Sequence, residues 1–426
     1  MSNRIFTVAI LGCGARGAET YGSLCAENGD KFKIVSLCDI DRVKLDKYAE
    51  RFGIDRQNCF LEEDSFFKER RSDLLIIATL DADHVRQCIK GIELGYDILL
   101  EKPITDNLEE CKKLLEVKNK SKSKVLICHV LRYAKAFMKT AELLNSGIIG
   151  KLVTMQAIEQ VAYWHQAHSY VRGNWRNREQ STPMILAKCC HDLDLLQYYA
   201  KSRCKTVSSM GNLFFFKSEN APQDAARRCL QCKYAESCPY SAKKIYIDGW
   251  KTGGNNENIW PQNVLTTKTP LTEENIYEAL ENGPYGRCVF YCDNDVVDHQ
   301  IVEMTFENGI DATLTMTAFT ASGGRIIKFF GTLGEIVLNE EEDTITIKQF
   351  GKLPTEYEVI RISAIAEQGY SHGGGDKGLI IRLYEILCGN TSEETSLEAS
   401  IESHLMGIYA EESRLQGGKL KYLHED

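Results

Sequence analysis

Five runs of apolar and β-branched residues, separated by helical patterns, lie between residues 5 and 130. The runs are IFTVAILG, FKIVSLCD, DLLIIAT, YDILLE and KVLICHV, and the helical patterns start near Arg16, Asp41, Asp83 and Asn107. Strands that alternate with helices form parallel, doubly wound sheets. We therefore expect an α/β domain of the Rossmann type over residues 1–130.

The rest of the chain has a different pattern, with longer strands whose residues alternate between apolar and polar. The strands are LVTMQAIEQVAYW, KTVSSMGNLFFF, HQIVEMTFE, IDATLTMTAF, GRIIKFFG and GEIVLNE, with helical patterns at 184–200, 375–388 and 395–415. Alternation and short turns predict a mostly antiparallel, open sheet. At 426 residues the chain exceeds one compact core. We expect a second, α+β domain over 131–426, with a polar insertion at about 218–297.

Charge and hydropathy exclude several kinds of partner. The net charge of −9 leaves no basic face for nucleic acid or an anionic membrane. Glycines interrupt the apolar run near the N-terminus before it could serve as a signal segment, and no later stretch is long enough to cross a bilayer. We therefore predict a cytoplasmic protein whose 16 cysteines are mostly thiols.

The sequence VAILGCGARG places Gly12, Gly14 and Gly17 directly after the first strand. In a G-x-G-x-x-G turn, the first glycine allows the tight bend and the second lets a pyrophosphate approach the backbone. The third lets the helix pack on the strand. The second strand ends in Asp39, which suits the ribose hydroxyls and favours NAD, whereas Arg42 keeps NADP open. The residues predicted to bind the cofactor are Gly12, Gly14, Ala15, Arg16, Gly17, Asp39, Arg42, Glu101 and Lys102.

The sequence YDILLEKPIT puts Glu101, Lys102 and Pro103 at the carboxyl end of a strand, where open α/β sheets bind their ligands. A lysine there can donate a hydrogen bond to a substrate oxygen. The alternative is a lysine that only pairs with Glu101.

The glycine turn, the E-K-P sequence and the antiparallel second domain with an H-x-x-D helix together resemble the Gfo/Idh/MocA oxidoreductase family. The resemblance implies a nicotinamide bound by the first domain and a sugar, cyclitol or related polyol held against the second. It also implies that Lys102 lies in the active site and that the family's helix histidine and acid correspond to His191 and Asp194. The segment HVLRYAKAF resembles the family's segment at the start of the second domain and makes His129, Arg132 and Tyr133 pocket candidates.

One position departs from the family pattern. Many members have an aspartate four residues before the histidine, where this chain has Ala187, followed by Lys188. The altered pair puts the usual substrate range in doubt.

The segment AKCCHDLDLLQYY carries the expected chemistry. On a helix over 184–199, Lys188, His191 and Asp192 share one side, and Asp194 is placed to hold the imidazole of His191. Oxidation of a secondary alcohol needs a base, and histidine suits that role. Lys102 and Lys188 could stabilise the developing alkoxide, or either could share the role of base.

Two other chemistries fit this segment poorly. Cys189, Cys190 and His191 are consecutive, and neighbouring helix side chains diverge by about 100°, so they cannot close on one tetrahedral ion. A cysteine nucleophile lacks a dedicated base.

Two further segments supply pocket candidates. Trp164, His165 and Trp175 lie in an aromatic stretch suited to the wall of a sugar site, or else to a surface loop with structural aromatics. The glycines of SHGGGDKG either bring His372 to the pocket or only shape the start of a helix.

The insertion is rich in cysteine, with Cys229, Cys232 and Cys238 followed by Cys288 and Cys292. Structural zinc on Cys229, Cys232, Cys238 and Cys292 is one interpretation and free thiols are the other, because the spacing matches no standard finger.

Together these features predict an NAD-dependent oxidoreductase acting on a secondary hydroxyl of a carbohydrate or polyol. An NAD-dependent enzyme that cleaves glycosides through transient oxidation and elimination is the alternative, and a non-catalytic nucleotide sensor is a third. An exposed sheet favours a homo-oligomer.

Overall fold

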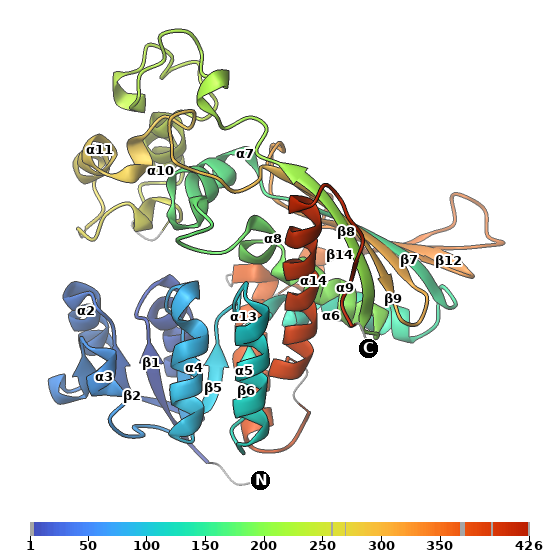
Figure 1. The fold of residues 1–426 in the computed structure, drawn as a ribbon, viewed down its shortest axis with the longest axis horizontal. Coiled ribbons are helices and arrows are strands. Elements are labelled where there is room, and N and C mark those ends of the chain that lie inside the picture. Colours follow the sequence, from blue (N-terminus) through green and yellow to red (C-terminus); the bar gives the residue numbers. More distant parts are fainter. Residues whose placement is uncertain (1–3, 257–258, 269, 367–370, 393–394, 425–426) are drawn as a thin grey trace.

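The computed structural model describes residues 4–256, 259–268, 270–366, 371–392 and 395–424. Its two sheets lie next to each other, and a separate lobe rises from the second (Figure 1). In the part of the chain described, no helix is long and apolar enough to cross a membrane.

The first sheet has six parallel strands in the order β3-β2-β1-β4-β5-β6. The strands are β1 Phe6–Leu11, β2 Phe32–Cys38, β3 Cys59–Phe60, β4 Leu74–Ile77, β5 Asp97–Leu100 and β6 Val125–Ile127. The helices between them are α1 Ser23–Glu27, α2 Arg42–Phe52, α3 Glu63–Phe66, α4 His84–Glu93 and α5 Leu108–Asn119. The predicted doubly wound fold is confirmed. The short β3 and α3 were not predicted.

Helix α13 (Gly375–Leu387) comes from the far end of the chain yet packs on this first sheet. Its residues Leu379 and Leu383 are fully buried in one cluster with Leu99 of β5 and Leu126 of β6. The parallel sheet needs helices on both faces, and α1 and α2 cover only part of this one. The first 130 residues therefore rely on a later helix to bury their core.

The second sheet has nine strands in the order β14-β13-β12-β11-β7-β10-β9-β8-β15. Among them only β7 and β10 pair in parallel, so the expected mostly antiparallel sheet is confirmed. The strands are β7 Leu152–Gln160, β8 Cys204–Asn212, β9 His299–Phe306, β10 Asp311–Thr317, β11 Gly324–Gly331, β12 Gly334–Asn339, β13 Thr344–Gln349, β14 Glu358–Arg361 and β15 Lys421–Tyr422. The last three were not predicted.

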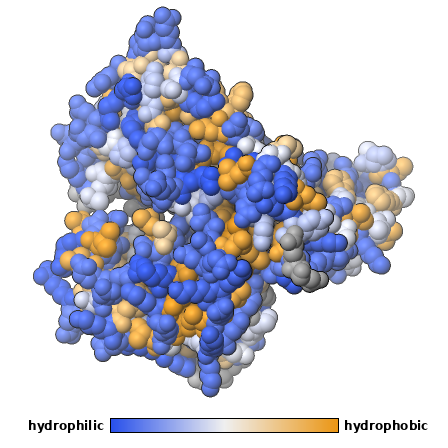
Figure 2. Space-filling model, in the orientation of Figure 1, coloured by the Kyte–Doolittle hydropathy of each residue, from blue (hydrophilic) through white to orange (hydrophobic). Residues whose placement is uncertain are grey.

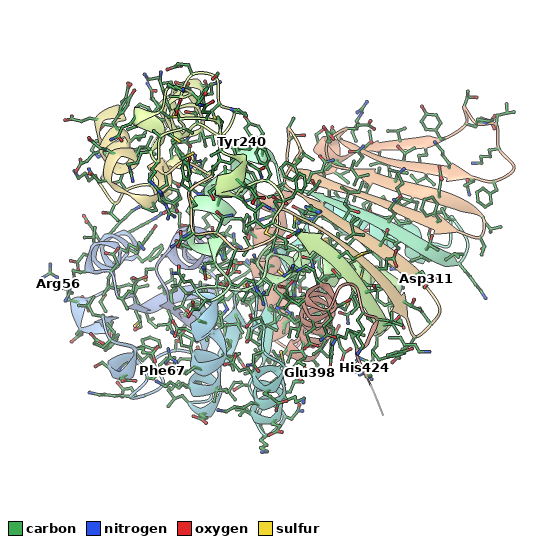
Figure 3. The ribbon with its side chains drawn as sticks, turned by 45° about the horizontal axis from the view of Figure 1, so that its top comes forward. Arg56, Phe67, Tyr240, Asp311, Glu398 and His424 are labelled. Carbon is green, nitrogen blue, oxygen red and sulfur yellow. The ribbon has the colours of Figure 1, made fainter. Side chains whose placement is uncertain are left out.

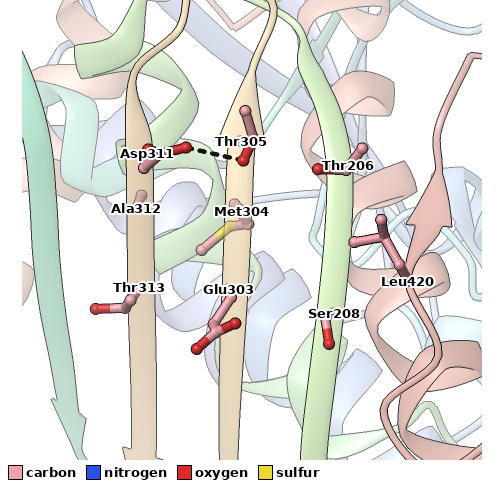
Figure 4. Close-up of a pocket in the computed structure, with 9 residues that line it drawn as sticks. All are labelled: Thr206, Ser208, Glu303, Met304, Thr305, Asp311, Ala312, Thr313 and Leu420. Atoms are coloured by element: carbon pink, nitrogen blue, oxygen red, sulfur yellow. Dashed lines mark hydrogen bonds between the residues drawn. The ribbon is translucent and has the colours of Figure 1, made fainter.

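Helices cover one face of this sheet. Helices α9 (Cys190–Ala200) and α14 (Leu397–Leu415) lie against it, and α6 (Lys135–Asn145), α8 (Met184–Ala187) and α12 (Ile362–Ile365) complete the second domain. Residues of β9 and β10 alternate strictly between buried and accessible positions. The other face carries a shallow hollow lined by polar side chains, where Thr305 Oγ1 donates to Asp311 Oδ1 at 2.8 Å (Figure 4).

The predicted insertion, between β8 and β9, forms the separate lobe. It contains α10 (Gly249–Thr252) and α11 (Glu273–Asn282) and buries its own apolar cluster around Phe216, Tyr246 and Trp250. Tyr240 marks the lobe in Figure 3. The lobe stands over the Rossmann domain, with a hollow between them in the space-filling view (Figure 2).

Candidate active site

The glycine turn after β1 has the shape that a dinucleotide requires. Gly12 has φ +94°, and a Cβ there would lie 2.4 Å from the carbonyl oxygen of Ala78. A Cβ on Gly17 would lie 1.9 Å from the carbonyl oxygen of Gly12. A Cβ on Gly14, in contrast, would meet no atom within 4 Å. The first and third glycines are thus required by packing, and the second leaves the backbone open to a ligand.

Asp39 stands beside this turn, directly after β2. Its Oδ2 accepts from the Cys13 amide at 2.6 Å and its Oδ1 from the Asp41 amide at 2.8 Å. These two bonds fix the carboxylate while each oxygen can accept another hydrogen bond. Arg42 is exposed and lies 3.8 Å from Asp46 on its own helix. The residues present therefore fit a dinucleotide whose ribose hydroxyls donate to Asp39.

The side chain of Arg16, which was predicted to bind the cofactor, makes hydrogen bonds with acidic side chains of the protein. Its Nε donates to Glu101 Oε1 at 2.7 Å and its Nη2 to Asp376 Oδ1 at 2.6 Å. Tyr21 also donates to Glu101. Burial acts to raise the pKa of Glu101, but the charges of Arg16 and Lys102 hold it below its usual value. Arg16 thus connects the glycine turn to the E-K-P strand end and to α13.

Lys102 points from that strand end toward the second domain. Its Nζ donates to the carbonyl oxygen of Ala187 at 3.0 Å. The turn behind it is held by His84, which bonds the Pro103 carbonyl at 2.7 Å, and by His404 Nε2, which accepts from the Ile104 amide at 2.8 Å. The backbone of residue 187 therefore contacts the lysine at the position where the family's aspartate is absent.

The helix expected over 184–200 is broken. It forms α8 and α9, with Lys188 and Cys189 between them. Lys188 Nζ lies 3.1 Å from Glu159 Oε1, and Asp192 accepts from Arg325 Nε at 2.8 Å. Lys188 and Asp192 are therefore linked through Glu159 and Arg325 on the sheet, although the helix that carries them is interrupted rather than continuous.

Glu159 and Arg325 were missed by the sequence analysis. They face each other on β7 and β11, and Arg325 Nη2 lies 2.9 Å from Glu159 Oε2. Both are buried, and burial raises the pKa of Asp192 although Arg325 opposes it. The alternation along the strand could have identified Glu159 as a buried charge, because it follows Met155 and Ala157 on the inward face.

Asp194 does not hold His191. Both of its carboxylate oxygens accept from Arg132, at 2.7 and 2.6 Å, so the expected pair of His191 with Asp194 is wrong. Tyr133 bonds Thr395 at 3.1 Å. Arg132 and Tyr133 are both buried behind the site. Arg132 is buried because the buried carboxylate of Asp194 needs a cationic partner.

His191 lies in a row of histidines. Its ring centroid is 6.0 Å from that of His129 and 6.2 Å from that of His372. Burial, and after it the charge of Lys102, lowers the pKa of His191 well below its ordinary value. Its Nδ1 is buried and has no hydrogen-bond partner among the described residues. The lowered pKa favours the neutral imidazole, the form that accepts a proton, and at the same time makes it a weaker base than an exposed histidine.

His372 reaches the site on a loop with left-handed backbone at His372, Gly373 and Gly374. Its Nδ1 bonds Asp376 Oδ2 at 2.8 Å, and its side chain is 38% exposed. Burial opposes ionisation, but His372 and Arg16 lower the pKa of Asp376 to about 2. A carboxylate therefore orients this histidine, as was expected for His191.

The predicted aromatic wall is only partly assembled. Trp164 stacks on His165 with centroids 5.7 Å apart, and Trp260 from the insertion lies 4.9 Å from His165. Trp175 packs near Tyr170 instead, beside a small hollow at the domain junction. Trp260 was missed, because nothing local in the sequence links it to Trp164.

The zinc interpretation of the insertion is not supported. All sixteen cysteines are free, and among the described residues no group of three or more His, Cys, Asp or Glu side chains is arranged to hold a metal ion. Cys229 and Cys288 are packed in the apolar cluster of the lobe. Ala167, Val171 and Ala318, which lie outside the insertion, belong to the same cluster.

The chain is similar to a set of known oxidoreductases. A family model described as "Oxidoreductase family, NAD-binding Rossmann fold" matches residues 6–129. A second, described as "Oxidoreductase family, C-terminal alpha/beta domain", matches residues 141–421.

Individual proteins show the same relationship. A putative oxidoreductase, YteT, of Bacillus subtilis is 23% identical over 380 residues, which are 84% of this chain and 85% of that protein. A glycosyl hydrolase family 109 protein of Shewanella sp. is 22% identical over 319 residues, 68% of this chain and 67% of that protein. A levoglucosan dehydrogenase solved with NADH and levoglucosan superposes with a TM-score of 0.72 at 14% identity, covering 99% of this chain and 100% of that chain.

The two family models together match most of the chain, and the observed sheets are those that their descriptions require. This protein belongs to the Gfo/Idh/MocA family of NAD-binding oxidoreductases.

Proposed function

We propose that this protein is an NAD-dependent oxidoreductase that oxidises a secondary hydroxyl of a sugar, cyclitol or related polyol. The observation that carries the proposal is the neutral, buried His191 next to Lys102, at the carboxyl edge of a sheet whose glycine turn fits a dinucleotide. NAD, when bound, supplies the hydride acceptor. Asp39 favours NAD over NADP because a 2′-phosphate would meet its carboxylate.

Three side chains would bind the substrate and move its proton. His191 accepts the proton of the reacting hydroxyl. Lys102 has donors beyond its bond to Ala187 and stabilises the oxygen as negative charge develops on it. Lys188, held by Glu159, orients a neighbouring hydroxyl or the same oxygen.

A second candidate is the redox-neutral cleavage of a glycoside, and His372 is the observation that favours it. Transient oxidation of a sugar makes the adjacent C–H acidic, so that a base can remove this proton while the leaving oxygen takes up another. Two histidines 6.2 Å apart, one buried and one held by Asp376, supply such a pair. The likeness to a protein named for glycosyl hydrolase family 109 supports the same reading.

The deciding experiment measures the cofactor first and turnover second. The mass of the dinucleotide that copurifies identifies it, and NADH absorbance with a polyol panel reports net oxidation. Aryl glycosides that release sugar without net NADH indicate the second candidate. If bound NAD is accompanied by neither activity, both proposals are wrong and the nucleotide sensor remains.

We also propose that the protein acts in the cytoplasm as a homo-oligomer that pairs through the open face of its second sheet. That face exposes Val153, Met210 and Ile301. Measurement of the mass in solution tests the oligomer, and a mass equal to one chain contradicts it.

A further inference from the structure

Two tryptophans from distant segments meet beside the site. Trp164 lies in α7 (Tyr163–His165), just after β7, and Trp260 comes from the insertion lobe. Their ring centroids are 5.4 Å apart with planes inclined by 59°. We call this pair the aromatic platform.

The platform is accessible. Trp260 is 41% exposed, whereas Trp250 of the same lobe is 7% exposed within its apolar cluster. The lobe can therefore bury a tryptophan and leaves this one against solvent. An exposed tryptophan offers an apolar ring face and a polar N–H group, a combination that suits a ligand with C–H and hydroxyl groups.

The platform is also continuous with the proposed active site. The strand that carries Glu159, the partner of Lys188, runs directly into α7. His165 contacts both tryptophans, with its ring centroid 5.7 Å from that of Trp164 and 4.9 Å from that of Trp260. Burial lowers the pKa of His165, and the charges of Lys188 and Lys102 lower it further, so both lysines are near this ring. The next residue, Gln166, is fully buried, and its amide has no hydrogen-bond partner among the described residues.

We propose that the aromatic platform binds a second sugar ring, so that the substrate is a disaccharide or larger glycoside rather than a free monosaccharide. Aromatic faces pack against the C–H surfaces of a sugar ring, and two inclined rings can contact both its face and its edge. This inference rests on the proposed function, because it assigns the part of the substrate beyond the reacting sugar.

The test compares Trp260→Ala with wild type on matched substrates: cellobiose, lactose, maltose and melibiose against glucose and galactose. We expect the best disaccharide to lose about tenfold in kcat/KM, mostly through KM, as the loss of one aromatic contact predicts. Monosaccharide turnover stays unchanged, and Trp260→Phe recovers most of the loss. Tyr277→Ala, an exposed aromatic of α11 in the same lobe, is the matched control and leaves both unchanged.

Equal loss on both substrate classes, or loss on neither, overturns the proposal. Calorimetric titration of the NAD-loaded protein with the same disaccharides separates it from the proposed function. If no saccharide is turned over, disaccharide binding that Trp260→Ala abolishes still supports the platform. Absence of disaccharide binding by the wild type overturns it. Turnover of monosaccharides with no preference for disaccharides overturns the platform and leaves the proposed function intact.

Discussion

The two halves of the site are built in different ways. In the cofactor half, Gly12, Gly14 and Gly17 lie within one turn, and Asp39 lies at the end of the adjacent strand. In the substrate half, Lys102, Glu159 and His372 come from three separate parts of the fold. The first half is specified by local sequence and the second by tertiary packing. The side chains of the substrate half therefore depend on partners that no local motif contains.

The largest effect should come from the substrate half. His191→Ala removes the proposed base and should lower kcat about a thousandfold, since a general base contributes on the order of 10²–10⁴. NADH titration followed by fluorescence should show unchanged cofactor binding, because the cofactor half is separate. His424→Ala, which removes a surface histidine paired with Glu402, is the matched control. Normal turnover by His191→Ala would show that another group is the base.

The cofactor half gives the next prediction, on two glycines that differ in surroundings. Gly17→Ala places a methyl group against the backbone oxygen of Gly12 and should destabilise the fold by about 3 kcal/mol or more. Gly14→Ala meets open space and should fold normally but bind NADH more weakly. Urea unfolding and NADH titration measure the two effects. Equal stability of both variants would mean that the turn is not fixed by packing.

Glu159→Gln tests whether the sheet supplies the acid that is absent at residue 187. The change removes the carboxylate that pairs with Lys188 and one of the carboxylates around Arg325, which should cost about 3 kcal/mol of unfolding free energy. We also expect a lower kcat/KM from the misplaced Lys188. Glu335→Gln, on an accessible strand position near Lys348, is the control. If Glu159→Gln matches this control in both measurements, the network does not position Lys188.

The smallest effect per residue is the pH dependence of stability. Burial lowers the pKa of His129 to about 4 and those of His168 and His404 to about 3, and it also lowers those of His165 and His191. Below pH ~6.5 the unfolded chain binds protons that the folded chain does not. Stability is therefore present above about pH 6.5 and is lost as the pH falls, by about 1 kcal/mol per histidine between pH 7 and pH 5.5.

Urea unfolding at the two pH values measures this loss. His168→Phe should reduce it by the share of one histidine. An identical pH dependence in His168→Phe and wild type would contradict the assignment.

The sequence predicted the fold class, the glycine turn and the strands of both sheets that have a clear pattern. It missed β14 and β15, the two edge strands of the second sheet, where burial imposes less pattern, and it also missed β13, which lies between β12 and β14. Within the site it predicted Lys102, Lys188 and His191 as neighbours of one pocket, and their catalytic roles remain proposals.

The partners of these residues could not be predicted. Asp194 is spaced correctly to hold His191 on a helix but binds Arg132, which lies 62 residues earlier. In the sequence, Glu159 is one residue of a strand that alternates between apolar and polar positions. Its ion pair depends on Arg325, which faces it on the neighbouring strand. Spacing along a helix shows which side chains are close, but competition with charged groups from elsewhere decides which of them pair.

The packing of helix α13 limits how the two domains of this protein can be separated or exchanged. It carries Asp376 at its first turn, covers the β5 and β6 end of the Rossmann sheet, and joins Arg16 to the second domain. A fragment that stops near residue 130 would leave that sheet face open to water. The nucleotide-binding half is therefore not a portable module. A chimera that exchanges the second domain must carry 375–387 with the first, although more than two hundred residues separate them in the gene.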